Sequence, residues 1–222
     1  FSFSNFSQPF TAEDRLQEHG VDLKSPENHF LQSMYLPVRA FNEHWQAKPS
    51  DKYPEEDALL EIYPRARDLY EALLGDNTAA DELVINLSWA ELAECVARMC
   101  PGAATLDELS AFCKEVMLSC AQHPLPEPNP EYDKDYRTPA WTPSTRTEAA
   151  QGLLILASYK RDAALLDAIR KLLNDPVPSV RVLVAHQLFL VYQHAPEFFW
   201  EVVNERLTNE ANIVVLKALY SD

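Results

Sequence analysis

The chain has 222 residues, a formal net charge of −15 and 47% hydrophobic residues, which is enough apolar material for a packed core. Such an acidic chain disfavours binding to nucleic-acid backbones and anionic lipid surfaces, and no apolar run approaches the roughly 20 residues that a membrane span needs. Its four glycines are too far apart to form a phosphate-binding or dinucleotide-binding loop.

The acidic charge is concentrated in the first part of the chain. Residues 1–141 carry 25 acidic and 11 basic side chains, whereas residues 142–222 carry 9 and 8. The sequence starts without a methionine or a signal-peptide pattern and ends inside a helical pattern, so we expect a piece of a longer polypeptide. Its few cysteines favour reduced thiols in a cytoplasmic protein.

Residues 1–122 predict an irregular, acidic helical region. Ser25 and Pro26 predict a helix start, because serine suits the N-cap and proline the first turn. Apolar residues at helical spacing continue to Trp45, with a kink or break expected at Pro37. Residues 55–74 give a further helical pattern, interrupted by Pro64. Residues 83–85 are short and β-branched like a strand, although the chain offers them few strand partners.

Two capping boxes predict the next two helix starts. Ser88 is followed three residues later by Glu91, and Thr105 by Glu108, so that each hydroxyl and each carboxylate can bind an end of the helix backbone. Pro101 and Gly102 lie between the two boxes and are expected to separate the helices.

Residues 123–141 form a predicted proline-rich linker or strap, because proline removes hydrogen-bond donors and favours extended backbone. We place a domain boundary here. Tyr132, Tyr136 and Trp141 are hard to bury within such a segment. They either pin the strap across the helices or contact a partner, and the sequence leaves both interpretations open.

Residues 142–222 contain an internal repeat. The sequence Pro143-Ser144-Thr145-Arg146 recurs as Pro178-Ser179-Val180-Arg181, 35 residues later. A period in the thirties is typical of helical solenoids, in which helix pairs bury their faces by stacking on one another. Helix starts are expected at Thr142 and Pro143, at Asp162, at Pro178, at Ala195 and Pro196, and at Ile213, where a third unit begins.

The sequence Asn174-Asp175-Pro176-Val177-Pro178-Ser179-Val180-Arg181 resembles the inter-unit turn and first helix of HEAT repeats. The resemblance implies that Asp175 caps the next helix, and that Arg181 pairs with such an aspartate of a neighbouring unit. Arg146 would form the preceding rung of this ladder. In the first unit Trp141-Thr142-Pro143 replaces the Asp-Pro turn, so Thr142 or Ser144 is the expected cap.

The resulting fold prediction is all-α, with an irregular N-terminal helical region followed by HEAT-like α-α repeats. Residues 146–153, 175–181 and 196–200 are also similar to repeats of large bacterial multidomain ATPases, some of which act in anti-phage defence. This second resemblance implies a sensor or regulatory arm whose ATPase lies outside the 222 residues.

The cysteines are the strongest candidates for chemistry. Cys95 and Cys100 are five residues apart, and Cys113 and Cys120 are seven apart, whereas structural zinc sites use ligands two to four residues apart. Buried thiols in apolar helices are the favoured interpretation. A small hydrolase with a cysteine or histidine nucleophile is the catalytic alternative, and we predict no catalytic, cofactor or metal residues.

Four aromatic residues lie in or directly before the repeat region: Trp141, Phe198, Phe199 and Trp200. Core packing between stacked units is favoured over an aromatic recognition patch. We expect a non-catalytic scaffold or interaction module that contacts a protein partner or another domain of the same polypeptide.

Overall fold

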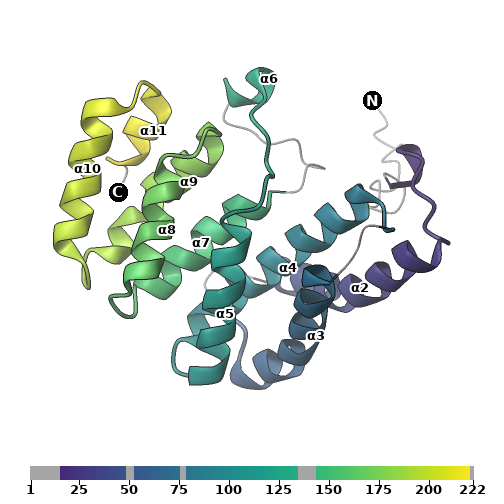
Figure 1. Ribbon diagram of the computed structural model, residues 1–222. Helices are drawn as coiled ribbons and strands as arrows, with labels where there is room; N and C mark the ends of the chain where they lie inside the picture. The colour runs from purple at the N-terminus through teal and green to yellow at the C-terminus, as the bar shows by residue number, and fades with distance from the viewer. Residues whose placement is uncertain (1–15, 49–52, 76–78, 135–143, 221–222) are drawn as a thin grey trace, which may run out of the picture.

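The protein is all-α in the residues that its structure, a computed structural model, describes: 16–48, 53–75, 79–134 and 144–220 (Figure 1). The α-helices are α2 (Pro26–Gln46), α3 (Glu56–Leu74), α4 (Glu82–Ala103), α5 (Asp107–Cys120), α6 (Pro130–Asp133), α7 (Thr145–Ala157), α8 (Ala163–Leu173), α9 (Pro178–Gln187), α10 (Pro196–Asn209) and α11 (Ile213–Ala218), and the 3₁₀-helix η1 spans Leu188–Val191. The all-α prediction is confirmed for these residues.

Several helix starts lie where polar caps and prolines predict them. The Ser25 hydroxyl accepts the Asn28 N–H at the start of α2. The Asp162 carboxylate caps α8 by accepting two backbone N–H groups, and Pro178 and Pro196 occupy the first positions of α9 and α10. These starts depend on local contacts, which explains why the sequence alone reveals them.

The region around residues 83–91 corrects the prediction. Residues 83–85 lie in α4 instead of a strand, and Ser88 lies in the interior of that helix, where its hydroxyl donates to the Val84 carbonyl. Asp81 provides the cap by accepting the Leu83 N–H. An alternative cap placed earlier, together with burial of Val84 and Ser88, extends the helix past the expected start.

Other expected boundaries are also absent. Pro37 and Pro64 lie inside α2 and α3, which continue past them. Both prolines are exposed, so water can bind the carbonyls that lose their helical partners. Pro101 lies in the last turn of α4, and α5 begins after Leu106 without a side-chain cap, instead of at Thr105.

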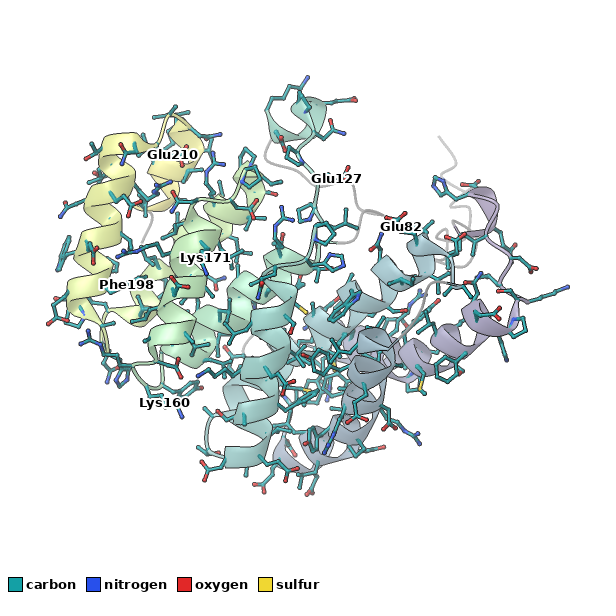
Figure 2. The ribbon with its side chains drawn as sticks, viewed as in Figure 1. Glu82, Glu127, Lys160, Lys171, Phe198 and Glu210 are labelled. Atoms are coloured by element: carbon teal, nitrogen blue, oxygen red, sulfur yellow. The ribbon has the colours of Figure 1, made fainter. Side chains whose placement is uncertain are left out.

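The helices follow one another across the molecule, from α2 and α3 on one side to α10 and α11 on the other (Figure 1). Helix α4 packs against α2, α3, α5 and α7, while α7 also contacts α5, α8 and α9. Figure 2 shows side chains filling the space between α4, α5 and α7. The apolar core therefore runs without a break from the residues before the predicted linker to those after it.

The start of the proline-rich segment packs against the core. Pro126 is buried, and the Leu125 carbonyl accepts the Arg146 N–H at the start of α7. Residues 130–133 then form α6. Thr142 and Pro143, the predicted start of the following helix, lie outside the described residues, and α7 begins at Thr145 after Ser144, which makes no side-chain cap bond.

Candidate functional site

Arg146 lies at the start of α7 and uses all five of its N–H donors. Its Nε and Nη2 bind the two carboxylate oxygens of Asp175 at 2.6 and 3.1 Å. Its Nη1 donates to the carbonyls of His123 and Pro124, and Nη2 also donates to that of Pro126. Because a guanidinium has five N–H donors, this buried ion pair is fully satisfied, which is the condition for tolerating buried charge.

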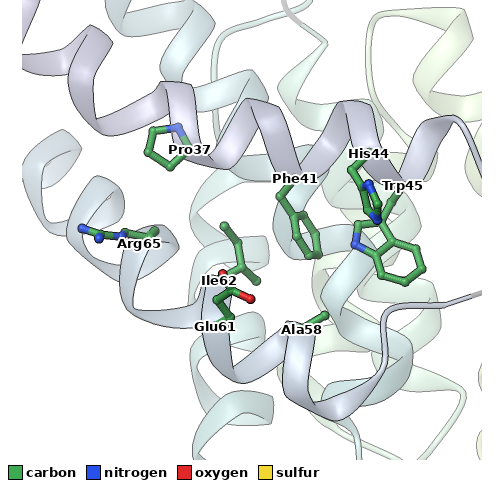
Figure 3. Close-up of a pocket in the computed structure, with 8 residues that line it drawn as sticks. All are labelled: Pro37, Phe41, His44, Trp45, Ala58, Glu61, Ile62 and Arg65. Atoms are coloured by element: carbon green, nitrogen blue, oxygen red, sulfur yellow. The ribbon is translucent and has the colours of Figure 1, made fainter.

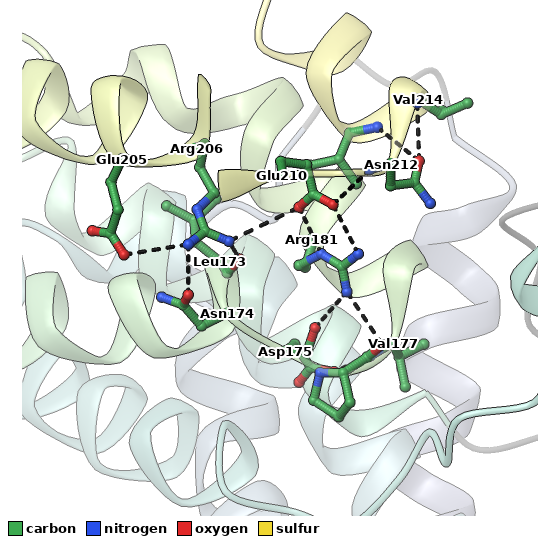
Figure 4. A network of polar contacts seen from close by, with 12 residues as sticks. Leu173, Asn174, Asp175, Val177, Arg181, Glu205, Arg206, Glu210, Asn212 and Val214 are labelled. Atoms are coloured by element: carbon green, nitrogen blue, oxygen red, sulfur yellow. Dashed lines mark hydrogen bonds and ion pairs between the residues drawn. The ribbon is translucent and has the colours of Figure 1, made fainter. Parts of the chain in front are cut away.

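Arg181 makes equivalent contacts 35 residues later (Figure 4). Its Nε and Nη2 bind the carboxylate oxygens of Glu210 at 2.9 and 3.2 Å. Its Nη1 donates to the carbonyls of Asp175 and Pro176 at 2.6 and 3.2 Å. Each arginine therefore binds carbonyls that precede its own helix and a carboxylate that follows the next helix.

The two carboxylates also repeat. Asp175 Oδ1 accepts the Val177 N–H at 2.8 Å, and Glu210 Oε1 accepts the Asn212 N–H at 2.9 Å. Each arginine lies 29 residues before its carboxylate. The same set of contacts thus recurs at one sequence period, in two successive turns.

Arg206 also contacts Glu210, the carboxylate partner of Arg181. Arg206 Nη1 lies 3.9 Å from Glu210 and donates to the Leu173 carbonyl, while Nη2 binds Asn174 Oδ1. Partial burial alone would raise the pKa of Glu210, but hydrogen bonds and the charges of Arg181 and Arg206 outweigh it and lower the pKa below 4.5. Glu210 is therefore ionised at neutral pH.

The structure brings Asp175 into contact with both arginines proposed for the ladder, but through different atoms of Asp175. Arg146 binds the carboxylate of Asp175, whereas Arg181 binds the backbone carbonyl of Asp175 and takes Glu210 as its carboxylate partner. Sequence reasoning missed Glu210. The signal was its distance of 35 residues from Asp175, but Ala211 stands where a proline follows Asp175.

The residues proposed for partner contact cannot be placed. Tyr136 and Trp141 lie outside the described residues, as does the side chain of Tyr132. Of the later aromatics, Phe198 is buried, with the Arg170 guanidinium 5.4 Å from its ring centroid (Figure 2). Core packing is therefore right for Phe198.

The predicted inward face of α10 is partly wrong. Trp200 was expected in the core but is 54% exposed, and Leu207 of the same helix is 41% exposed. The buried positions of α10 are Phe198, Val202, Val203 and Arg206. The short 3₁₀-helix η1 lies between α9 and α10.

Three rings form a partly exposed aromatic cluster, which we define as Tyr192, Phe199 and Trp200. Their centroids lie 5.3 Å apart for Tyr192 and Phe199, and 5.0 Å apart for Phe199 and Trp200, with the rings edge-to-face. Tyr192 is 48% exposed. Clustered aromatic rings at a surface are typical of the anchor residues of protein interfaces.

The four cysteines are buried free thiols, as predicted. Burial raises the pKa of Cys95, Cys100 and Cys120 above the ordinary range, so these thiols stay protonated and are poor nucleophiles. Among the described residues, no group of three or more histidine, cysteine, aspartate or glutamate side chains is arranged to hold a metal ion.

Two grooves open beside Trp45. The first, about 440 Å³, lies between α2 and α3 and is lined by Phe41, His44 and Trp45 on one side and by Glu61 and Arg65 on the other (Figure 3). The second, about 340 Å³, lies between the end of α2, the residues before α3, α4 and α7. We call this second groove the Trp45 cleft.

A charged network lies beside the Trp45 cleft. Glu94 Oε1 accepts hydrogen bonds from Gln46 Nε2 at 2.5 Å and from Arg98 Nη2 at 2.7 Å. Burial, and then the charge of Glu94, raise the pKa of Glu148 to about 7, while the charge of Arg98 acts in the opposite direction. Arg98 is thus the direct ion-pair partner of Glu94.

Comparison with models of protein families, with curated protein sequences and with solved structures finds no match to this chain. Across the described ranges, no helix combines the length and apolar character that crossing a bilayer requires.

Proposed function

We propose that this chain is a non-catalytic interaction module, built as an α-solenoid of HEAT-like helix pairs. It presents its surface to a protein partner or to another domain of the same polypeptide. The observation that carries the proposal is the recurrence of the Arg146–Asp175 pair as the Arg181–Glu210 pair at a period of 35 residues. Periodic contacts between neighbouring units are what holds a solenoid together.

Ion pairs between the second helices of neighbouring units support the same arrangement. Arg170 on α8 binds Glu201 on α10 at 2.8 Å. Asp162, the cap of α8, forms an ion pair with Lys114 on α5. Helices α5, α8 and α10 are thereby linked in chain order, each to the next.

The aromatic cluster supports a role in binding. Trp200 and Tyr192 are about half exposed, and tryptophan and tyrosine are enriched among the residues that dominate interface energetics. Neither ring is needed to fill the core. A protein contact at this surface would bury them.

The test is to purify the tagged chain from the organism that encodes it and to separate its complexes by size-exclusion chromatography. We expect a protein to co-elute at a fixed ratio with the wild-type chain, and the Trp200→Ala and Tyr192→Ala variant to lose it. Lys171→Ala, an exposed change on α8, is the matched control and should retain the partner. Elution of the wild-type chain alone, or equal recovery with all variants, would count against a partner at this cluster.

A further inference from the structure

Helix α10 lies at one edge of the molecule and contacts α8 on its inner side (Figure 1). Arg170 of α8 binds Glu201 of α10 at 2.8 Å, and Arg206 of α10 donates to Asn174, the residue that ends α8. Arg170 and Asn174 are four residues apart, so they lie on one face of their helix. This face of α8 is therefore the contact between one helix pair and the next.

The corresponding face of α10 is apolar. The residues that cap the starts of α8 and α10 are 33 positions apart. At that spacing Val203 and Leu207 stand where α8 has Arg170 and Asn174, and Trp200 lies one turn before Val203. We define Trp200, Val203 and Leu207 as the outer face of α10. Its two ends are open to solvent, since Trp200 is 54% exposed and Leu207 is 41% exposed.

An apolar outer face is unusual at the edge of a repeat array. The terminal units of such arrays carry a polar outer face, because that face meets water. The apolar surface here also extends beyond α10, since the half-exposed ring of Tyr192 lies edge-to-face with Trp200 at 6.3 Å between centroids. The outer face of α10 thus has the character of a contact between units.

Helix α11 has the position of the first helix of a third unit. Glu210 accepts the Asn212 N–H before α11, as Asp175 accepts the Val177 N–H before α9. Helix α11 packs against α9, as α9 packs against α7. In both earlier pairs the second helix begins 18 residues after the first. Because α11 begins at Ile213, a second helix at the same spacing would begin after residue 222.

We propose that the outer face of α10 is covered by the second helix of this third unit, which the same polypeptide supplies after residue 222. This inference rests on the proposed function and selects one of its two partners for this face, another part of the same polypeptide. Trp200 and Leu207 are apolar where α8 uses polar groups, so the covering helix presents an apolar stripe to them.

The first test is the sequence of the encoding gene. The reading frame should continue past residue 222, and an amphipathic helical pattern should begin within about ten residues if the spacing of the earlier pairs is kept. A stop codon directly after residue 222 would overturn the proposal, as would a sequence without an apolar helical stripe.

The second test compares the chain of 222 residues with the same chain extended by one further period of 35 residues from its gene. Acrylamide quenching of the Trp200 fluorescence is obtained as the difference between each chain and its Trp200→Phe variant. Quenching should fall several-fold in the extended chain, because the added helix shields the ring. Equal quenching in the two chains would contradict the proposed cover.

A matched pair of leucine variants tests the same contact through stability. Leu207→Ala should lower the urea midpoint of the extended chain more than that of the 222-residue chain. Leu60→Ala is the control, because Leu60 is 53% exposed on α3, at the other side of the molecule (Figure 1). It should have the same effect in both chains. If Leu207→Ala also has equal effects in both, the added residues do not cover α10 and the proposal fails.

A second copy of the chain and a separate protein are the alternative occupants of this face. Concentration-dependent dimerisation of the extended chain that requires Trp200 would assign the face to a second copy. Co-elution of another protein with the extended chain, lost in Trp200→Ala, would assign it to that protein. Either result would overturn this inference and leave the proposed interaction function in place. Protection of Trp200 in the extended chain, with no protein co-eluting, would support this inference and count against a separate partner at the aromatic cluster.

Discussion

Removal of the Arg146 side chain should destabilise the fold more than removal of any other charged side chain discussed above. Arg146→Ala leaves the Asp175 carboxylate, whose side chain is 5% exposed, without its counter-ion. It also leaves the carbonyls of His123, Pro124 and Pro126 without this donor. Breaking a buried ion pair from one side costs about 3–5 kcal/mol, and we expect a loss of that size in the free energy of unfolding.

Arg181→Ala should cost less, about 1–3 kcal/mol. The Arg181 side chain is 14% exposed, and its partner Glu210 keeps Arg206 as a second cation at 3.9 Å. Arg67→Ala is the surface control, because Arg67 and Glu71 are both more than half exposed. Exposed pairs of this kind contribute little, so this change should leave the free energy of unfolding almost unchanged.

Urea unfolding followed by far-UV circular dichroism measures all three variants. If Arg146→Ala is too unstable to fold, Arg146→Lys keeps the charge but loses the forked geometry, and it should still be less stable than the wild type. The Arg146→Ala, Asp175→Ala double variant should cost less than the two single changes added together, because the pair is then removed from both sides. A loss below about 1 kcal/mol for Arg146→Ala, or one no larger than for Arg181→Ala, would refute the reasoning.

Three further predictions concern pH, capping and thiols. The pKa of Glu148 is about 7 in the folded chain against an ordinary 4.5. The buried carboxylate therefore lowers the free energy of unfolding as the pH rises from about 4.5 through 7. In urea titrations, Glu148→Gln should stabilise the chain by about 1–2 kcal/mol at pH 8 and by much less at pH 5. Asp162→Ala should lower the free energy of unfolding by about 1 kcal/mol in the same assay, whereas Asp162→Asn keeps the cap, loses only the ion pair with Lys114, and should cost less. The four buried thiols should resist a disulfide-exchange reagent at pH 8 in the native chain and react in urea; fast native labelling of Cys95 or Cys100 would contradict their burial.

Local signals made parts of the fold predictable. Ser25 with Pro26, Asp162, Pro178 and Pro196 mark helix starts through contacts made within a few residues. No long-range information is needed to recognise them. The repeat of Pro143–Arg146 at Pro178–Arg181 likewise predicts that Arg146 and Arg181 have equivalent positions.

Long-range packing decided the positions that the sequence did not reveal. Ser88 with Glu91 has the spacing of a capping box, but Ser88 is completely buried and the helix extends back to Glu82. Trp200 has the apolar character of a core residue, but the phase of α10 turns it outward. Both outcomes depend on how helices from distant parts of the chain meet.

The contacts of Arg146 connect the start of the proline-rich segment to the repeat. Arg181 binds the carbonyls of the turn at Asp175 and Pro176, directly before α9. Arg146 binds carbonyls between His123 and Pro126, directly after α5, although its own helix begins only at Thr145. Residues 123–126 thus provide the backbone carbonyl acceptors for Arg146, as the turn at Asp175 and Pro176 does for Arg181.

If the arginine contacts define the boundaries of the repeat units, α4 and α5 form the helix pair that precedes α7 and α8. Their packing against α7 and the Lys114–Asp162 pair between α5 and the start of α8 agree with that place. The segment that follows Pro126 and contains α6 would then be an insertion between two helix pairs. The change in composition at residue 123 is, on this reading, the mark of a long turn inside the repeat array, and the acidic helices before it belong to the same stack as the helices after it.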